Sequence, residues 1–188
     1  LGVESIYRNR SEAYESFIEY LKLDEGERLW VIASSLQGFE AVSGNFSIWD
    51  AIKVGARNKN LRVLLTDPEY SRYREKPEER ISGQIKGEIG VALNKLTEIH
   101  QVPDDFIRLY PGTPTVAAIA TSSHMLLNPY PYGDSSFHCF SIIVRKTADE
   151  KHVYNQYIDK HFQQGWKLAR ELTDRDKQWY QALSQSDV

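Results

Sequence analysis

The sequence has only one cysteine, Cys139, among its 188 residues. A single thiol cannot form an internal disulfide, and it cannot by itself supply a cysteine-rich zinc site. Free cysteine is among the most frequently buried residue types, so we predict that Cys139 is a buried strand residue. A disulfide framework is therefore excluded.

Long hydrophobic runs are also missing. No apolar stretch approaches the length that spans a bilayer, and no charged leader precedes an apolar segment. We therefore expect a cytoplasmic protein that does not contact a membrane. The sequence begins Leu1-Gly2-Val3 without a methionine, which suggests a module from a longer polypeptide whose missing domain holds part of the function.

Neither sign of charge is in large excess. The chain has 23 Lys and Arg against 26 Asp and Glu, for a net charge of −3, and the basic residues are scattered. Non-specific nucleic-acid binding needs a basic field, so nucleic acid is not favoured as a partner, although a local basic patch remains open.

Several catalytic and metal-binding signatures are absent as well. There is no glycine-rich phosphate loop, no zinc signature and no Ser-His-Asp pattern. His152 and His161 are nine residues apart on a predicted helix, which is the wrong spacing for shared metal ligation. We expect neither a metal nor a cofactor.

Helical and strand-like segments alternate along the first half of the chain. Helical spacing of apolar residues at 11–21, 47–56 and 79–100 alternates with apolar runs at 29–33 and 61–68. This order implies right-handed crossovers and parallel strands, followed by further strands at 106–110 and 137–144. From about residue 152 an aromatic stripe predicts a core-packed helix.

We therefore predict an α/β fold with a mixed, partly parallel sheet flanked by helices. The predicted division is an α/β domain at 1–170 and a C-terminal helical appendage at 171–188. The strongly charged segment 69–79 is predicted to be a mobile loop.

Residues 110–132 form the segment around which the chain is organised. Apolar runs at 116–120 and 125–127 flank the polar turn at 121–124, which predicts two antiparallel strands. Such pairing brings the polar residues at both mouths of the hairpin to one edge of the sheet. These residues are Thr113, Thr115, Asn128, Tyr130 and Tyr132.

Polar residues also follow the buried strands, where open α/β sheets usually bind ligands. Ser34 and Ser35 follow the first strand, and Thr66 and Asp67 end the second. We predict a ligand site at this edge, with Arg72 or Arg74 closing over it. The predicted ligand-binding residues are Ser35, Thr66, Arg72, Thr113, Thr115, Asn128, Tyr130 and Tyr132. The alternative is that these residues only bond to turn backbone. Arg8 and Arg10 precede the first helix, and we favour a solvated turn over an anion contact for them.

The segment 110–132 resembles the signature of the phospholipase D superfamily, which reads His-x-Lys, four residues, Asp, six residues and a glycine. With Asn128 in the glycine position, the catalytic positions hold Pro114, Val116 and Thr121. A shift of one residue places Thr113, Thr115 and Ala120 there instead. The resemblance implies one half of a phospholipase D fold over most of residues 5–170, and the absence of the catalytic residues argues against the activity.

The sequences Leu64-Leu-Thr-Asp-Pro68 and Leu127-Asn-Pro-Tyr-Pro-Tyr132 are similar to non-catalytic phospholipase D-like domains of bacterial regulatory proteins. We expect a catalytically inactive sensor or interaction module of a larger regulatory protein, binding a small polar or phosphorylated ligand. One alternative is a divergent phosphodiesterase or nuclease that uses His138. Another is a scaffold that keeps the superfamily's homodimer contact.

Overall fold

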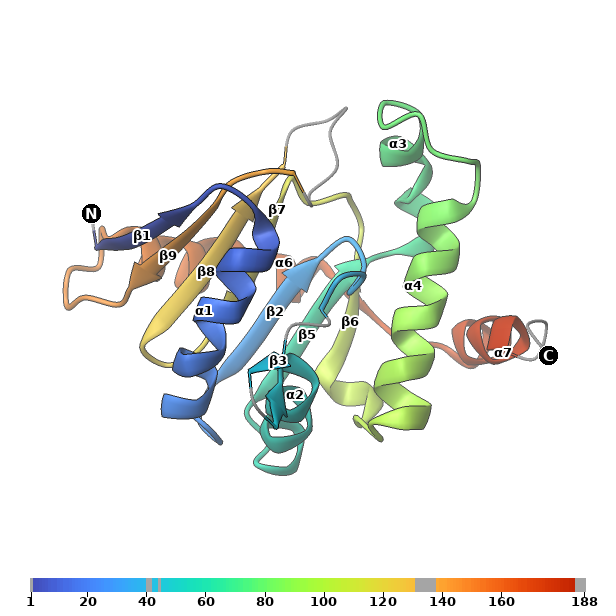
Figure 1. Ribbon diagram of the computed structural model, residues 1–188. Coiled ribbons are helices and arrows are strands. Elements are labelled where there is room, and N and C mark those ends of the chain that lie inside the picture. The colour runs from blue at the N-terminus through green and yellow to red at the C-terminus, as the bar shows by residue number, and fades with distance from the viewer. Residues whose placement is uncertain (1, 40–41, 44, 131–137, 185–188) are drawn as a thin grey trace.

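The computed structural model describes residues 2–39, 42–43, 45–130 and 138–184. Within these residues the central layer is a sheet of eight strands in the order β1-β9-β8-β7-β2-β5-β6-β10. Helices α1, α2 and α4 lie on one face of the sheet and α6 lies on the other (Figure 1). The predicted mixed, partly parallel α/β fold is confirmed.

The parallel part of the sheet comprises β2 (Leu29–Ala33), β5 (Leu61–Thr66) and β6 (Ile107–Tyr110). All five residues of β2 are buried, as the unbroken apolar run predicted. The crossover from β2 to β5 contains α2 (Ile48–Arg57), whose N-terminus has a capping box between Ser47 and Asp50. Helices and strands alternate in this part of the chain because each helix covers the apolar face that the neighbouring strands present.

The antiparallel part is built on the predicted hairpin, β7 (Val116–Ala120) and β8 (His124–Pro129). It continues through β9 (Ser141–Arg145) to β1 (Val3–Tyr7). The strand predicted at 137–144 is β9, which begins at Ser141, and Cys139 is buried just before it. Sequence reasoning missed β1, β10 (Arg170–Glu171) and the small hairpin of β3 (Val42–Ser43) and β4 (Phe46–Ser47).

Helix α1 (Arg10–Leu23) begins one residue earlier than predicted, because Asn9 caps it and accepts a hydrogen bond from the Glu12 N–H at 3.0 Å. The long helix predicted from residue 79 begins later, as α4 (Gln84–Asn94), and continues as a π-helical turn, Lys95–Ile99. Gly83 precedes it with φ at 84°, and Ile81 is 79% exposed, so the predicted first turn does not pack.

The predicted charged loop at 69–79 is helical through much of its first half and ends in turns. A 3-10 turn, Pro68–Tyr70, leads into α3 (Arg72–Glu75). Glu75 is buried, and its carboxylate accepts hydrogen bonds from the backbone N–H groups of Gly83 and Ile85, both at 3.0 Å. The loop prediction was wrong because charge alone did not show that these side chains fold inward.

The second face of the sheet is covered by α5 (Val153–Asn155), a π-helical stretch, Gln156–Phe162, and α6 (Gln163–Leu168). Tyr154, Ile158, Phe162 and Trp166 are buried against the sheet in a core of their own. The predicted packing role of this aromatic stripe is confirmed.

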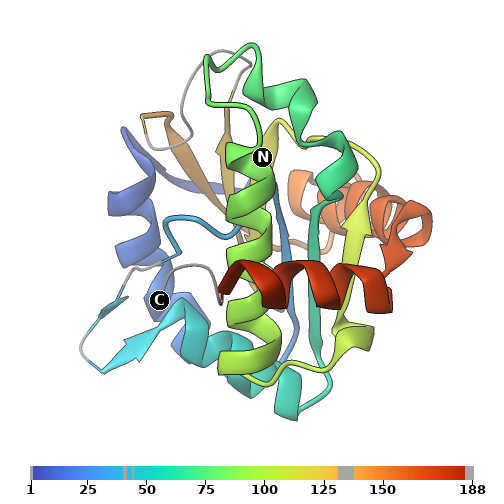
Figure 2. The same cartoon turned by 90° about the vertical axis from the view of Figure 1, so that its right-hand side faces the viewer.

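The C-terminal helix α7 (Asp174–Ser184) crosses α4 at a steep angle (Figure 2). Gly90 of α4 lies under Trp179 and Leu183, and Tyr180 belongs to the main core. Strand β10 spans the predicted boundary between 170 and 171, and the division into domain and appendage stays a prediction. Within the described ranges, none of the helices has the length and apolar character needed to traverse a bilayer.

Candidate functional site

The candidate site lies at the edge of the sheet where the parallel strands have their carboxyl ends. Strands β2, β5, β6 and β8 end at this edge, and β7 begins there because it is antiparallel to both β2 and β8. Ser34, Asp67 and Tyr130 directly follow three of these strands. The predicted convergence of strand ends is therefore observed.

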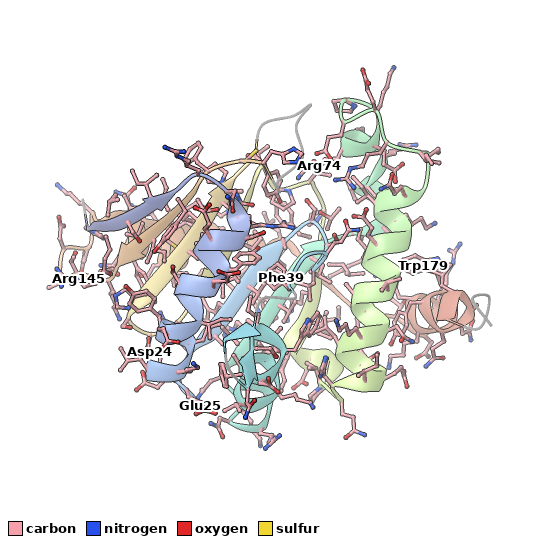
Figure 3. The ribbon with its side chains drawn as sticks, viewed as in Figure 1. Asp24, Glu25, Phe39, Arg74, Arg145 and Trp179 are labelled. Atoms are coloured by element: carbon pink, nitrogen blue, oxygen red, sulfur yellow. The ribbon has the colours of Figure 1, made fainter. Side chains whose placement is uncertain are left out.

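Arg74 is the central side chain at this edge. It is only 4% exposed, although it comes from the short helix α3 at the end of the sheet (Figure 3). Its Nη1 donates to Ser34 Oγ at 3.0 Å and to the Pro114 carbonyl at 3.2 Å. The guanidinium lies 4.1 Å from the centre of the Tyr130 ring. Arg74 thus joins the end of β2, the start of β7 and the end of β8.

Two carboxylates and a second arginine continue this network. Glu78 accepts from Arg74 Nε at 2.5 Å and from Arg80 Nε at 2.7 Å. Arg80 also donates from Nη1 to Glu88 on α4 at 2.8 Å, and Glu88 accepts from Ser35 Oγ at 3.3 Å. The Glu78 side chain is only 3% exposed, and its carboxylate pairs with both arginines.

A small cavity of about 30 Å³ lies within the network. Arg10, Ser34, Arg74, Glu78 and Tyr130 are among the residues that line it. Arg10 is 5% exposed and donates from Nη2 to the Gln37 carbonyl at 3.0 Å, so the solvated turn favoured for it is wrong. The volume holds about two water molecules. A larger ligand would extend beyond this volume or displace the side chains that line it.

Tyr130 has a different environment from the one expected. It is 3% exposed, and its hydroxyl lies 3.2 Å from Ser34 Oγ. Burial raises the pKa of the phenol and outweighs the opposing effect of Arg74. The hydroxyl is therefore protonated at neutral pH and serves as a hydrogen-bonding group in the cavity wall.

Thr66 and Asn128 are buried near the ends of β5 and β8 at the same edge of the sheet, and neither lines the cavity. Asn128 Nδ2 donates to the Phe140 carbonyl and to Ser141 Oγ, both at 3.1 Å, which fits the alternative of a turn-bonding role. Among the described residues, Asn128 Oδ1 and Thr66 Oγ1 have no hydrogen-bond partner. Thr66 is 0% exposed, so its unpaired hydroxyl is the clearest polar anomaly at this edge.

The remaining predicted residues lie farther from the cavity or outside it. Arg72 is exposed, and its Nη2 is 3.5 Å from the neighbouring Tyr73 hydroxyl, so of the two arginines expected at the site Arg74 lines the cavity and Arg72 does not. Thr115 is exposed, and its carbonyl accepts from the Tyr130 N–H at 2.8 Å. Thr113 is half-buried, the His138 side chain is exposed, and Tyr132 lies outside the described residues.

Sequence reasoning missed Glu78, Arg80 and Glu88, and it assigned Arg10 to a solvated turn. The available signal was the spacing of opposite charges, since Arg74 and Glu78 are four residues apart and pair across one helical turn. Their burial was not visible in that pattern. The described part of the chain contains no cluster of His, Cys, Asp or Glu with the arrangement of a metal site.

The positions of the resembling motif fall at both ends of β7. The Pro114 carbonyl accepts a hydrogen bond from Arg74, so the first position of the motif contacts a cavity-lining side chain through its backbone. Thr121 lies at the far end, where its Oγ1 donates to Asp24 at 2.5 Å in the hairpin turn. The titratable side chains that line the cavity are arginine, glutamate and tyrosine, a set suited to binding polar or anionic groups.

No protein-family model and no curated protein matches the chain. Among solved structures, it is similar to a phosphatidylserine synthase from Haemophilus influenzae, a member of the phospholipase D superfamily. The TM-score is 0.56 at 14% identity, over 96% of this chain and 42% of that one. It is also similar to TrmBL2, an archaeal chromatin protein described as binding DNA, with a TM-score of 0.50 at 10% identity, over 89% of this chain and 54% of that one. The chain thus spans about half the length of these structures, and the likeness shows a shared fold.

Proposed function

We propose that the chain is a catalytically inactive, phospholipase D-like sensor module that binds a small polar or phosphorylated ligand at the carboxyl edge of its sheet. The observation that carries this proposal is the buried arginine and glutamate network around the cavity. In this proposal the module belongs to a larger bacterial regulatory protein, and ligand binding changes how it contacts the rest of that protein.

The charges at the cavity support an anionic group on the ligand. Arg10, Arg74 and Arg80 line the cavity together with only two carboxylates, Glu78 and Glu88. A phosphate or carboxylate could take the place of Glu78, which pairs with Arg74 through Oε1 alone, and bind the guanidinium through two oxygens. Ser34 and Tyr130 would then supply neutral hydrogen bonds to the same ligand.

The shape of the site supports a role in sensing more than in catalysis. The cavity is small and is lined by the salt bridges that a ligand would replace, so in this proposal occupancy and rearrangement are coupled. A ligand that binds only the rearranged state shifts the population toward it. Helix α3 carries Arg74, and it is the element most directly moved by this exchange.

A thermal-shift screen with phosphorylated metabolites, nucleotides and organic acids tests the proposal. A ligand present at about 100 times its Kd stabilises the protein by about 2.7 kcal/mol, which is readily detected. We expect at least one stabilising compound, and we expect its effect to be lost in Arg74→Lys, which retains the charge but not the bidentate geometry. Arg72→Lys, on the exposed side of the same short helix, is the matched control.

A hit that stabilises Arg74→Lys as strongly as the unchanged protein would place the ligand elsewhere. A broad panel without any hit would favour the scaffold alternative, for which light scattering should then show a homodimer. Hydrolysis of phosphodiesters that is lost in His138→Ala and retained in Cys139→Ser would contradict the inactive assignment.

A further inference from the structure

A second group of arginines lies on the other face of the sheet, the face covered by α6. Arg28, Arg62 and Arg108 alternate with two indole rings, and we call these five side chains the arginine ladder. Arg28 and Arg62 lie 4.5 and 4.7 Å from the centre of the Trp30 ring. Arg62 and Arg108 lie 5.2 and 4.9 Å from the centre of the Trp166 ring. Each indole therefore contacts two cations.

The backbone register determines how the ladder is spaced. Trp30 of β2 is opposite Arg62 of β5, and Leu64 of β5 is opposite Arg108 of β6. Each arginine is thus displaced by two residues along the strand relative to the arginine before it. With strands about 4.8 Å apart and a rise of about 3.3 Å per residue, successive arginine Cα atoms are about 8 Å apart. The ladder is a diagonal row across the sheet.

The positive charge of this row is poorly compensated. Arg62 Nη1 donates to the neutral Gln163 side chain at 3.1 Å, and Arg108 Nη1 donates to the Trp166 carbonyl at 2.9 Å. Within the described residues, the row forms an ion pair between Arg108 Nη2 and Glu171 Oε1 at 3.3 Å. The Glu171 side chain is 76% exposed. Exposed pairs of this kind contribute little.

Two further observations show that the row is under electrostatic stress. Burial lowers the pKa of Arg62, and the charges of Arg108 and Arg28 lower it further. Within the described residues, Arg108 Nε is buried and has no hydrogen-bond acceptor. An anion placed along the row would offset the mutual repulsion of these charges and offer acceptors to the accessible guanidinium nitrogens.

The spacing and the packing select the kind of anion. The arginine Cα atoms at the two ends of the row are about 16 Å apart, a span that matches an extended chain of phosphates better than a single small anion. Trp30 is 8% and Trp166 is 9% exposed, because the arginines and the neighbouring core cover their rings. The indoles therefore orient the arginines and do not offer a free surface for base stacking, which favours contact with a phosphate backbone over the reading of bases.

We propose that the arginine ladder binds single-stranded nucleic acid through its phosphate backbone, without sequence preference. This site is separate from the cavity, since it uses the opposite face of the sheet and none of the residues that line the cavity. Because the protein as a whole has a net charge of −3, the attraction of nucleic acid is limited to this local row of arginines.

Fluorescence anisotropy with a labelled thymidine oligonucleotide of about 20 nucleotides, titrated over a range of salt concentrations, tests this assignment. Three phosphate contacts on a single strand predict a slope of log K against log salt of about −2. Loss of one contact in Arg62→Gln should reduce the slope to about −1.4 and weaken binding about fivefold at about 0.1 M salt. Arg28→Gln, at the outer end of the row, should have the same effect.

Two variants distinguish phosphate binding by the arginine ladder from the effects of side-chain packing and of net charge. Arg62→Lys keeps the charge and should keep most of the slope, even if the ring contacts and the melting temperature change. Arg57→Gln removes an exposed arginine from α2, on the other face, and should leave both the affinity and the slope unchanged. Melting curves for all variants establish that each one is folded.

Three results would overturn the proposal. The first is absence of binding by the unchanged protein at low salt. The second is an equal loss of binding in Arg57→Gln, which would indicate a diffuse charge effect. The third is binding of a polyglutamate peptide as tightly as the oligonucleotide, which would assign the ladder to an acidic protein partner.

Discussion

Replacing Arg74 with methionine should destabilise the protein strongly, because the substitution leaves a buried carboxylate with one partner fewer. Arg74 is 4% exposed and bonds to Glu78, Ser34 and Pro114. Removing one partner of a buried ion pair typically costs about 3–5 kcal/mol. Glu78 still keeps Arg80 at 2.7 Å, so we expect the lower end, about 3 kcal/mol.

Urea unfolding, followed by circular dichroism and tryptophan fluorescence, measures this loss. With a dependence of about 2–3 kcal/mol per molar urea, the midpoint should fall by about 1 M or slightly more. The exposed neighbour Arg72 provides the control, and Arg72→Met should leave the midpoint unchanged. The double variant, which combines Arg74→Met with Glu78→Met, is measured in the same way.

The double variant tests the cause of the effect. When both charges are replaced by apolar side chains, the uncompensated carboxylate is gone, so the double variant should be more stable than Arg74→Met alone. A loss below about 1 kcal/mol in the single variant, or a double variant that is less stable than the single one, would refute the reasoning.

Three further outcomes are expected. Thr66→Val should stabilise the protein by about 1 kcal/mol in urea unfolding, because it removes a fully buried hydroxyl that has no partner; a Thr66→Val variant less stable than the unchanged protein would reveal an unrecognised hydrogen bond. Burial alone would raise the pKa of Asp176, but hydrogen bonds from Arg170 and Thr173 outweigh it and lower the pKa to about 2. The ionised Asp176 carboxylate therefore stabilises the protein above its unfolded pKa of about 3.9, and this stabilisation is lost as the pH falls toward 2. The melting temperature of Asp176→Asn should therefore fall less between pH 5 and pH 3 than that of the unchanged protein, and parallel curves would contradict this. Gly90→Val should displace α7 and make it sensitive to limited proteolysis, whereas the same change at Gly87, where a Cβ meets no neighbour, should not.

Much of the sheet could be predicted from the sequence because its strands are either fully apolar or joined by a short turn. The run 29–33 is buried at every position, and the hairpin of β7 and β8 follows directly from its two apolar runs. Strand β1 could not be predicted in the same way. Val3 is 46% and Ile6 is 68% exposed, so the residues of β1 follow no clear apolar pattern. The partner strand, β9, is also distant in the sequence.

The location of the candidate site was easier to predict than its chemistry. Strand ends follow from topology, so Ser34 and Tyr130 were expected at the same edge. The network of Arg74, Glu78 and Glu88 depends on which charged side chains fold inward, and that is decided by tertiary packing. A charged segment has the same composition whether it is solvated or buried, which is why 69–79 was predicted to be a loop.

The pairing of β1 with β9 has a consequence for the order in which the molecule folds. Residues 3–7 are the first strand of the chain, yet their partners are residues 141–144. The strand therefore remains without its neighbour until most of the chain has been synthesised, whereas β2, β5 and β6 can already associate. Contacts between such distant segments slow folding, because a large loop must close before they form. The docking of β1 should thus be a late event, and the edge of β9 should be exposed to other chains until that step is complete.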